Sequence, residues 1–247
     1  MHTDPTQRFS SRVEDYIRYR PSYPSGVADL LARECGLTAH SRIADIGSGT
    51  GLLARLFLDF GCEVFGVEPN LDMRHAGERQ LADRPRFRSV NGRAEATTLP
   101  EHSFDFVTAA QAFHWFEPGK ASAEFRRILR PDGWVVLVWN ERLKVPGFNA
   151  GYEDLVTRYG PEPTHAETEE LVRFFGHTDW RLVTLPNEQQ FDFEGLRGRF
   201  LSSSYAPLPA TPRYNTLMEE LGHLFEEYQQ NGRVTLLYGT EVYFGNL

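Results

Sequence analysis

A run of glycines behind an acidic residue carries the clearest chemical meaning in this sequence. Asp45-Ile46-Gly47-Ser48-Gly49-Thr50-Gly51 stands between an apolar stretch, Arg42–Ile46, and a helical pattern over Leu52–Phe60. The apolar stretch predicts a buried strand, so the glycines occupy a strand-to-helix turn. Glycine there lets the backbone approach a ligand closely, and N–H groups at the helix start can donate hydrogen bonds to it. The spacing therefore predicts a ligand site at the carboxyl end of this strand.

The glycine spacing separates two classes of ligand. A dinucleotide site needs Gly-x-Gly-x-x-Gly, and its third glycine, counted from Gly47, would fall where Leu52 stands. Asp45 would repel a pyrophosphate but suits a ligand with an ammonium and a sulfonium group. Glu68 ends the next predicted strand, where it can accept both hydroxyls of a ribose in either class. These features favour the ligand with the ammonium and sulfonium groups, and together with Glu68 they weigh against a turn with only a structural purpose.

Alternating strands and helices must position this site. Further strands are predicted over Glu63–Glu68, Arg86–Val90, Phe104–Ala109 and Trp134–Trp139, with helices over Leu71–Leu81 and Ala121–Leu129. Such alternation is typical of a parallel sheet with helices on both faces.

The pattern changes after about Asn140. It predicts helices over Ala150–Arg158, Ala166–Phe174 and Asn215–Tyr228, an extended segment over Arg181–Gln190, and a last strand over Val234–Phe244. We expect this strand to lie antiparallel beside the preceding one, because a lone strand is unstable in water. The helices between 146 and 232 are then expected to form an insert or lid near the strand ends.

Several stretches, in the right order, resemble motifs of the class I S-adenosylmethionine-dependent methyltransferases. Asp45–Gly51 resembles motif I, and Val67-Glu68-Pro69-Asn70 resembles the acidic turn after the second strand. Gly92-Arg93-Ala94-Glu95, Leu99-Pro100 and Ser103-Phe104-Asp105 resemble the stretch that holds the adenine. Leu129–Gly133 resembles the turn before strand five, although Asp132 replaces a glycine. The resemblance spans roughly residues 40 to 140.

A narrower resemblance concerns a small-molecule subgroup, methyltransferase type 11. Phe9, Tyr16, Tyr19–Pro24 and Gln111–Phe116 resemble ubiquinone/menaquinone-biosynthesis-like and trans-aconitate-methyltransferase-like proteins. The resemblance implies an α/β, Rossmann-like doubly wound sheet of seven strands, mostly parallel with the last strand antiparallel, plus a helical insert or lid. We expect one domain over 1–247: lid helices over 1–36, the cofactor core over 37–145, a substrate-side helical region with strand six over 146–232, and the final strand over 233–247.

The cofactor set follows from the motifs and from a tyrosine-rich opening that we expect to fold over the site. The residues expected to bind S-adenosylmethionine, or its product S-adenosylhomocysteine, are Asp45, Gly47, Ser48, Gly49, Gly51, Glu68, Pro69, Ala94, Glu95, Gln111, Tyr16, Tyr19 and Arg20.

The acceptor side follows from residues after strands four and five. Methyl transfer by in-line displacement needs alignment and exclusion of water, and a base only for an alcohol, phenol or acidic carbon. His114 is the candidate base, but we favour packing of His114 and Trp115 against the cofactor loop. Trp115 could otherwise stack on substrate. Arg142 fits either a grip on an acceptor carboxylate or a surface ion pair. We expect a small anionic or amphipathic acceptor.

Composition excludes other classes. The net charge of −8 argues against affinity for nucleic acid. No apolar run approaches the roughly 20 residues of a membrane span, and the first residues lack a secretory pattern. Two cysteines suggest a reducing compartment, so we expect a cytoplasmic monomer or homodimer. The histidines show no metal-ligand spacing. A cofactor-binding protein without catalysis, a nucleotide-fold oxidoreductase and macromolecular methylation stay open as alternatives.

Overall fold

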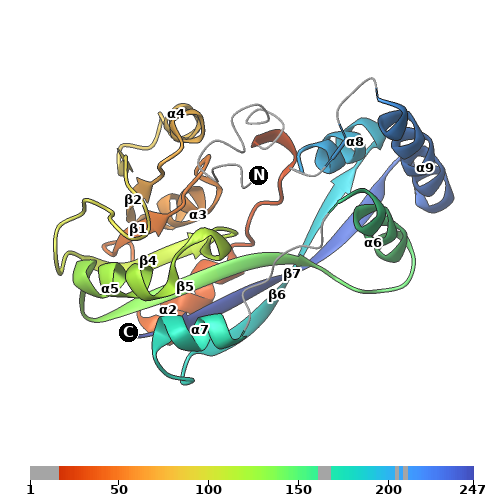
Figure 1. Cartoon of the computed structure of the whole chain (residues 1–247). Coiled ribbons are helices and arrows are strands. Elements are labelled where there is room, and N and C mark those ends of the chain that lie inside the picture. Colours follow the sequence, from red (N-terminus) through yellow and green to blue (C-terminus); the bar gives the residue numbers. More distant parts are fainter. Residues whose placement is uncertain (1–16, 161–167, 204–205, 208–210) are drawn as a thin grey trace.

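The computed structural model describes residues 17–160, 168–203, 206–207 and 211–247. In this part of the chain, seven strands form one sheet in the order β3-β2-β1-β4-β5-β7-β6 (Figure 1). Neighbours from β3 to β5 pair in parallel, and β7 lies antiparallel between β5 and β6. The Rossmann-like sheet with an antiparallel last strand is therefore confirmed.

The strands are bounded as β1 Arg42–Ile46, β2 Glu63–Val67, β3 Phe87–Val90, β4 Phe104–Ala110, β5 Leu129–Arg142, β6 Arg181–Phe191 and β7 Val234–Gly245. The helices are α2 Gly26–Cys35, α3 Leu52–Phe60, α4 Leu71–Gln80, α5 Pro118–Ile128, α6 Phe148–Tyr159, α7 Thr168–Phe175, α8 Phe193–Leu201 and α9 Pro212–Tyr228, with a 3-10 turn, η3, over Phe113–Trp115. None of the helices in the described ranges is long and apolar enough to cross a bilayer.

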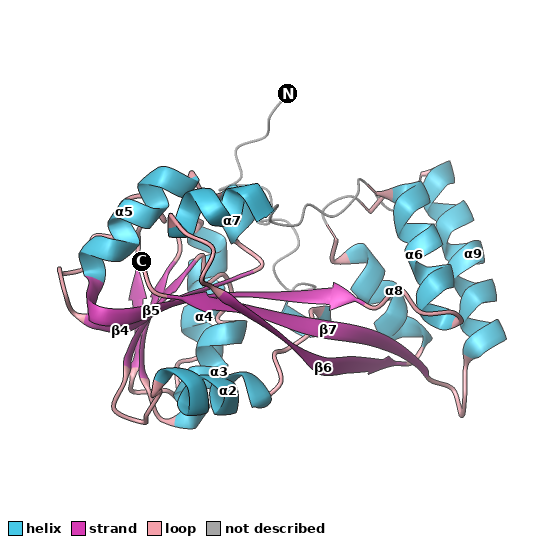
Figure 2. Ribbon diagram, turned by 90° about the horizontal axis from the view of Figure 1, so that it is seen from below, coloured by secondary structure: helices cyan, strands magenta, loops and turns pink. Residues whose placement is uncertain are grey.

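Helices cover both faces of the sheet, as the alternating pattern predicts (Figure 2). On one face, α2 and α3 bury Leu31 and Phe57 against β1, β2 and β4. On the other face, α5 and α7 bury Phe125 and Phe174. These apolar layers hold the strands in place, so that the carboxyl ends of β1, β2, β4 and β5 meet at one edge.

Two expectations about lids are corrected by this packing. Helix α2 lies within the stretch 1–36 that we expected to form a lid, but Val27 and Leu31 are fully buried on the sheet. Helix α7 lies in the expected insert, yet Phe174 and Phe175 pack beside α5 in the main core. Both helices bury an apolar stripe too large to leave exposed.

A second core forms where the last strands leave the main sheet. Strands β5, β7 and β6 continue past the other strands to the cluster of α6, α8 and α9 (Figure 2). Tyr152, Leu196 and Leu221, one from each helix, are fully buried there together with Leu236 and Tyr238 of β7. We call this part the distal lobe.

Two elements differ from expectation. Strand β5 is longer than the predicted Trp134–Trp139 because its pairing with β4 shifts register between Leu129 and Trp134, and the strand continues to Arg142. Helix α8 has no counterpart in the sequence prediction. Gly195 and Gly198 lower its helix propensity, so packing in the distal lobe must supply the missing stability.

Phe174→Ala is expected to lower the free energy of unfolding by about 3–5 kcal/mol, since Phe174 is fully buried against Phe113 and Phe125. Arg173→Ala, at an exposed position of the same helix, is the control and should change it little. Denaturant unfolding measures both. A loss of activity without a loss of stability would instead make α7 a lid.

Candidate functional site

The glycine loop between β1 and α3 is tied to the neighbouring strand by its own backbone. The N–H groups of Gly47 and Ser48 donate to the carbonyl of Val67 at 2.9 and 3.2 Å. Gly47, Gly49 and Gly51 all have positive φ angles, of 68°, 55° and 84°. A Cβ at Gly51 would come within 2.6 Å of a side-chain carbon of Leu81. Both conformation and space therefore require glycine, and the loop forms an open backbone cradle.

Asp45 lies buried at the base of this loop, with 1% of its surface exposed. Its Oδ1 accepts a hydrogen bond from Thr108 Oγ1 at 2.9 Å, whereas its Oδ2 makes no hydrogen bond of normal geometry with the described residues, although the backbone N–H of Ala54 is near enough to lower the pKa of Asp45. Desolvation raises the pKa of Asp45 to about 7, and the nearby charge of Glu68 adds to the effect. The buried hydroxyl of Thr50 has no hydrogen-bond partner in the described structure. An unsatisfied acid beside a glycine cradle fits a cationic ligand.

Glu68 holds the cradle as well as facing it. Its Oε2 accepts from the N–H of Gly49 at 2.9 Å, and its Oε1 accepts from the N–H of Asn70 at 2.8 Å. Burial raises the pKa of Glu68 above its usual range. Each carboxylate oxygen keeps a second lone pair, so the predicted bonds to a ribose remain available. Glu68 therefore has a structural role in addition to its predicted role in binding a ligand.

Other predicted cofactor residues surround the same edge. Pro69 precedes Asn70, whose side chain caps α4 by accepting from the N–H of Met73 at 3.0 Å. Ala94 is buried on the turn after β3, and Glu95 accepts from the N–H of Glu117 at 2.8 Å. The structure thus places these residues beside the ends of β2 and β3.

Gln111 ends β4 in a strained position. Its φ angle is 52°, a conformation that residues other than glycine adopt rarely. Its backbone N–H donates to the carbonyl of Val138 at 3.0 Å, and its Nε2 donates to the carbonyl of Asn140 at 3.2 Å. These bonds turn the chain outward at the carboxyl edge, where strain is typical of functional positions.

The first described residues, Ile17–Tyr23, cross this edge, and we call them the N-terminal strap. Ile17 packs against Met73 and Ala76 of α4, beside the glycine loop. The ring of Tyr19 lies against Gly198 of α8, where a Cβ would come within 2.2 Å of it. The strap therefore connects the cofactor side to the distal lobe. Tyr16, and the Phe9 of the resemblance, lie outside the described residues.

Hydrogen bonds fix the strap along its length. Gln189 Nε2 donates to the carbonyl of Tyr19 at 3.2 Å, and Arg20 Nη2 donates to the carbonyl of Ser202 at 3.2 Å. The side-chain amides of Asn140 and Asn187 both donate to the carbonyl of Ser22, at 3.2 and 2.8 Å. The strap is thus held by both β5 and the distal lobe.

A cavity of about 120 Å³ lies beneath the strap, and we call it the acceptor cavity after the role that we propose for it below. Leu52, next to the last glycine of the loop, forms one wall, and α8 forms another. Its lining consists of Arg20, Pro21, Tyr23, Leu52, Gln111, Asn140, Glu141, Arg142, Arg199 and Ser203. It therefore joins the glycine loop, the ends of β4 and β5, and the distal lobe.

His114 and Trp115 are not among the described residues that line this cavity. They lie on η3 with ring centroids 4.8 Å apart, next to the buried Phe113. Trp115 keeps 39% of its surface exposed, and the packing of these two residues against the cofactor loop stays a prediction.

Arg142 reaches the cavity but is also held by an acid. Its Nε and Nη2 donate to the two carboxylate oxygens of Glu153 on α6, at 2.6 and 3.2 Å. The Arg142 side chain is 15% exposed and that of Glu153 is 32% exposed, so the ion pair is half-buried. The pair links the end of β5 to the distal lobe.

Among the lining residues that sequence reasoning did not assign to the site are Asn140, Glu141 and Arg199. Asn140 and Glu141 directly follow the predicted strand Trp134–Trp139, so their place at its carboxyl end was a signal that could have identified them. Arg199 belongs to the unpredicted α8. Asp192, which caps α8 by accepting from the N–H of Gly195 at 2.7 Å, was the available signal for that helix.

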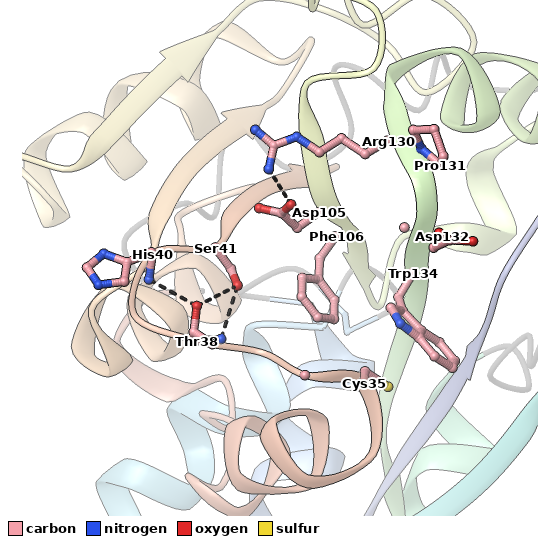
Figure 3. A pocket seen from close by; sticks show the side chains of 12 residues that line it. Cys35, Thr38, His40, Ser41, Asp105, Phe106, Arg130, Pro131, Asp132 and Trp134 are labelled. Atoms are coloured by element: carbon pink, nitrogen blue, oxygen red, sulfur yellow. Dashed lines mark hydrogen bonds and ion pairs between the residues drawn. The ribbon is translucent and has the colours of Figure 1, made fainter.

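A larger hollow of about 370 Å³ lies at the opposite, amino-terminal edge of the sheet (Figure 3). Its polar groups bond one another: Arg130 pairs with Asp105, and the backbone N–H of Thr38 donates to Ser41 Oγ at 3.0 Å. Ligands of open α/β sheets bind at the carboxyl edge, so the acceptor cavity is the better candidate despite its smaller volume.

Known proteins resemble this chain in sequence. Residues 44–137 match the family described as a methyltransferase domain. An uncharacterized methyltransferase of Mycobacterium tuberculosis is 36% identical over 157 residues, which cover 64% of this chain but only 62% of that protein. The uncharacterized methyltransferase YcgJ of Bacillus subtilis is 31% identical over 234 residues, which cover 92% of this chain and 89% of that protein.

Solved structures share the fold. A protein of Anaeromyxobacter dehalogenans described as a type II methyltransferase gives a TM-score of 0.71 at 22% identity, covering 92% of this chain and 98% of that one. Phosphoethanolamine N-methyltransferase 2 of Haemonchus contortus, solved with phosphomonomethylethanolamine and S-adenosylhomocysteine, gives 0.57 at 17% identity, covering 98% and 58%. The chain belongs to the methyltransferase-domain family, and its sheet has the Rossmann-like fold of these methyltransferase structures.

Glu68→Ala is expected to lower the free energy of unfolding by about 2–4 kcal/mol, because the N–H groups of Gly49 and Asn70 lose their buried acceptor. Glu68→Gln keeps one acceptor oxygen and should cost less. The exposed Glu101→Ala is the control. Denaturant unfolding of the three variants tests this, and an unchanged stability of Glu68→Ala would contradict the structural part of its role.

Asp45 should make stability depend on pH. Because its pKa is raised from 3.8 to about 7, the protonated form is favoured in the folded state. Its contribution is fully present below about pH 4 and is lost as the pH rises to about 7. Asp45→Asn should remove this part of the dependence of stability on pH, while Asp83→Asn, at an exposed position, should not. Thermal unfolding between pH 4 and 8 measures it, and identical slopes for Asp45→Asn and wild type would refute it.

Proposed function

We propose that this chain binds S-adenosylmethionine at the glycine loop and transfers a methyl group to a small molecule in the acceptor cavity. One observation carries the proposal. The cavity opens beside Leu52, directly after a glycine cradle that has an unsatisfied buried acid, Asp45, at its base. A cationic ligand in the cradle would thus lie next to a space for a second molecule.

The residues present fit the cofactor. Asp45 would stabilise its positive charge, Gly47, Gly49 and Gly51 would let the backbone approach it, and Glu68 would accept the ribose hydroxyls. When bound, S-adenosylmethionine supplies an electrophilic methyl group. The S-adenosylhomocysteine in the Haemonchus structure supports the choice of cofactor.

The chain's own residues would align the acceptor and exclude water. The N-terminal strap covers the cavity, while Gln111 and Asn140 present polar groups from the ends of β4 and β5. Such positioning is the main catalytic task for a displacement that needs no covalent intermediate. A carboxylate acceptor would need no general base, which agrees with the position of His114 outside the cavity lining. His114 stays a candidate base for an acceptor that enters from its side of the loop.

The proposal extends to the rest of the chain. We place acceptor selection in the region 146–232, because α8 and the Glu153 ion pair border the cavity. A cavity of about 120 Å³ under a strap favours a small molecule over RNA or a protein chain. We also propose a reducing, cytoplasmic location, because Cys35 and Cys62 are free thiols. A monomer or homodimer stays our expectation for its assembly.

The binding test uses isothermal calorimetry on the purified chain. S-adenosylmethionine and S-adenosylhomocysteine should bind, and NAD and NADH should bind at least about a hundredfold more weakly, since Asp45 would face their pyrophosphate. Below the pKa of Asp45, which lies at about 7, each unit increase in pH ionises more of Asp45. The affinity for S-adenosylhomocysteine should therefore increase with pH in this range, by up to about tenfold per unit. No heat with either sulfur compound in a folded sample would refute the proposal.

A transfer test separates catalysis from silent binding. Chain and methyl-labelled cofactor are incubated with small carboxylic acids, phenols and quinone precursors, and in parallel with RNA and protein extracts. Label in the small molecules supports the proposal. Label confined to RNA or protein would show that the acceptor is a macromolecule and not a small molecule. Cofactor binding without any label would favour a binding protein that has no catalytic activity.

A further inference from the structure

A buried guanidinium lies deep in the acceptor cavity. Arg199, on α8, keeps only 3% of its surface exposed, yet it is one of the residues that line the cavity. A charged group this deep costs free energy unless its donors are satisfied and its charge is compensated. Arg199 is thus a charged group built into the cavity wall, where its Nη1 donates to Ser203 Oγ at 3.5 Å.

A chain of hydrogen bonds fixes the direction of this guanidinium. Arg199 Nε donates to the hydroxyl of Tyr238 at 3.2 Å, and that hydroxyl donates to Gln189 Oε1 at 3.0 Å. Gln189 Nε2 in turn donates to the carbonyl of Tyr19 on the strap at 3.2 Å. The orientation of Arg199 is therefore coupled to the strap that covers the cavity. A guanidinium group held in one orientation can donate two parallel hydrogen bonds to a planar carboxylate.

The charges around the cavity favour an anion. Its lining holds three guanidinium groups, Arg20, Arg142 and Arg199, and one carboxylate, Glu141. Glu153 adds a second carboxylate through its ion pair with Arg142. Among the lining side chains, guanidinium groups thus outnumber carboxylates.

We propose that Arg199 determines acceptor specificity by binding a carboxylate of the acceptor, with Tyr238 and Gln189 as positioning residues. The inference rests on the proposed function, because it concerns the acceptor of the same site. The bond is an anchor: guanidinium N–H groups donate to both carboxylate oxygens, and no covalent bond changes there.

The test uses two carboxylate probes and their neutral counterparts: acetate with acetamide, and benzoate with benzamide. Each is titrated by calorimetry into wild type and variants, with and without saturating S-adenosylhomocysteine. Wild type should bind at least one acid about tenfold or more tighter than its amide. Arg199→Gln should weaken that acid by about tenfold to a hundredfold, the range of a hydrogen bond to a charged group, and leave the amide unchanged.

The control lies on the same helix. Arg197 has 43% of its side chain exposed and pairs with Glu194 at 2.6 Å, so Arg197→Gln should bind the acids as wild type does. Arg199→Lys keeps the charge without the fork and should fall between wild type and Arg199→Gln. Should Arg199→Gln fail to fold, Arg199→Lys and the less buried Arg20→Gln carry the test, each with weakened acid binding.

Equal affinity for acid and amide, no binding of either acid by wild type, or wild-type affinity in folded Arg199→Gln would overturn the inference. The titrations distinguish failure of the proposed function from failure of the inference about Arg199. Absence of S-adenosylhomocysteine binding removes the proposed function, whereas titrations of the acids without cofactor still report on Arg199. Retained cofactor binding with no effect of Arg199 removes the inference alone.

Discussion

The carboxylate of Glu68 is the one interaction on which the geometry of the cofactor side depends. A loop of glycines has no side chains with which to hold its shape, and its backbone must stay open for a ligand. Glu68 solves this by accepting the N–H of Gly49 with one oxygen and the N–H of Asn70 with the other. It thereby ties the end of β1 to the start of α4. The same burial that makes these bonds strong also raises the pKa of Glu68.

Asp45 adds a second buried acid to the same place, and the two disfavour each other's ionised forms. The Oδ2 atom of Asp45 makes no hydrogen bond of normal geometry in the described structure. The folded chain therefore keeps an electrostatic cost that a positively charged ligand would relieve, and this relief would contribute directly to affinity. Functional sites commonly retain such costs, because a fully satisfied site has no net interaction left to offer.

Local patterns predicted the elements that surround the cofactor, because neighbouring residues determine them. Strand Arg42–Ile46 and helix Leu52–Phe60 have the predicted bounds. Helix α7 was predicted as a helix, but its place beside α5 depends on Phe174 meeting Phe125, a contact between distant segments. Helix α8 escaped prediction because its glycines weaken the local signal. One of them, Gly198, is where the ring of Tyr19 lies. Arg199 was not predicted either, because it belongs to α8 and only the fold brings it to the cavity.

Asn140 shows how the distal lobe and the sheet share the acceptor side. Its Oδ1 accepts from Thr240 of β7 and from Asn187 of β6, and its Nδ2 donates to the carbonyl of Ser22. One amide at the end of β5 thus joins three strands to the N-terminal strap. Because β7 also packs against α6, α8 and α9 in the distal lobe, the strands that hold Asn140 at the cavity are the strands on which that lobe is built. The glycine loop follows a different strand, β1, and bonds to β2, so changes in the distal lobe can alter the cavity without altering the loop.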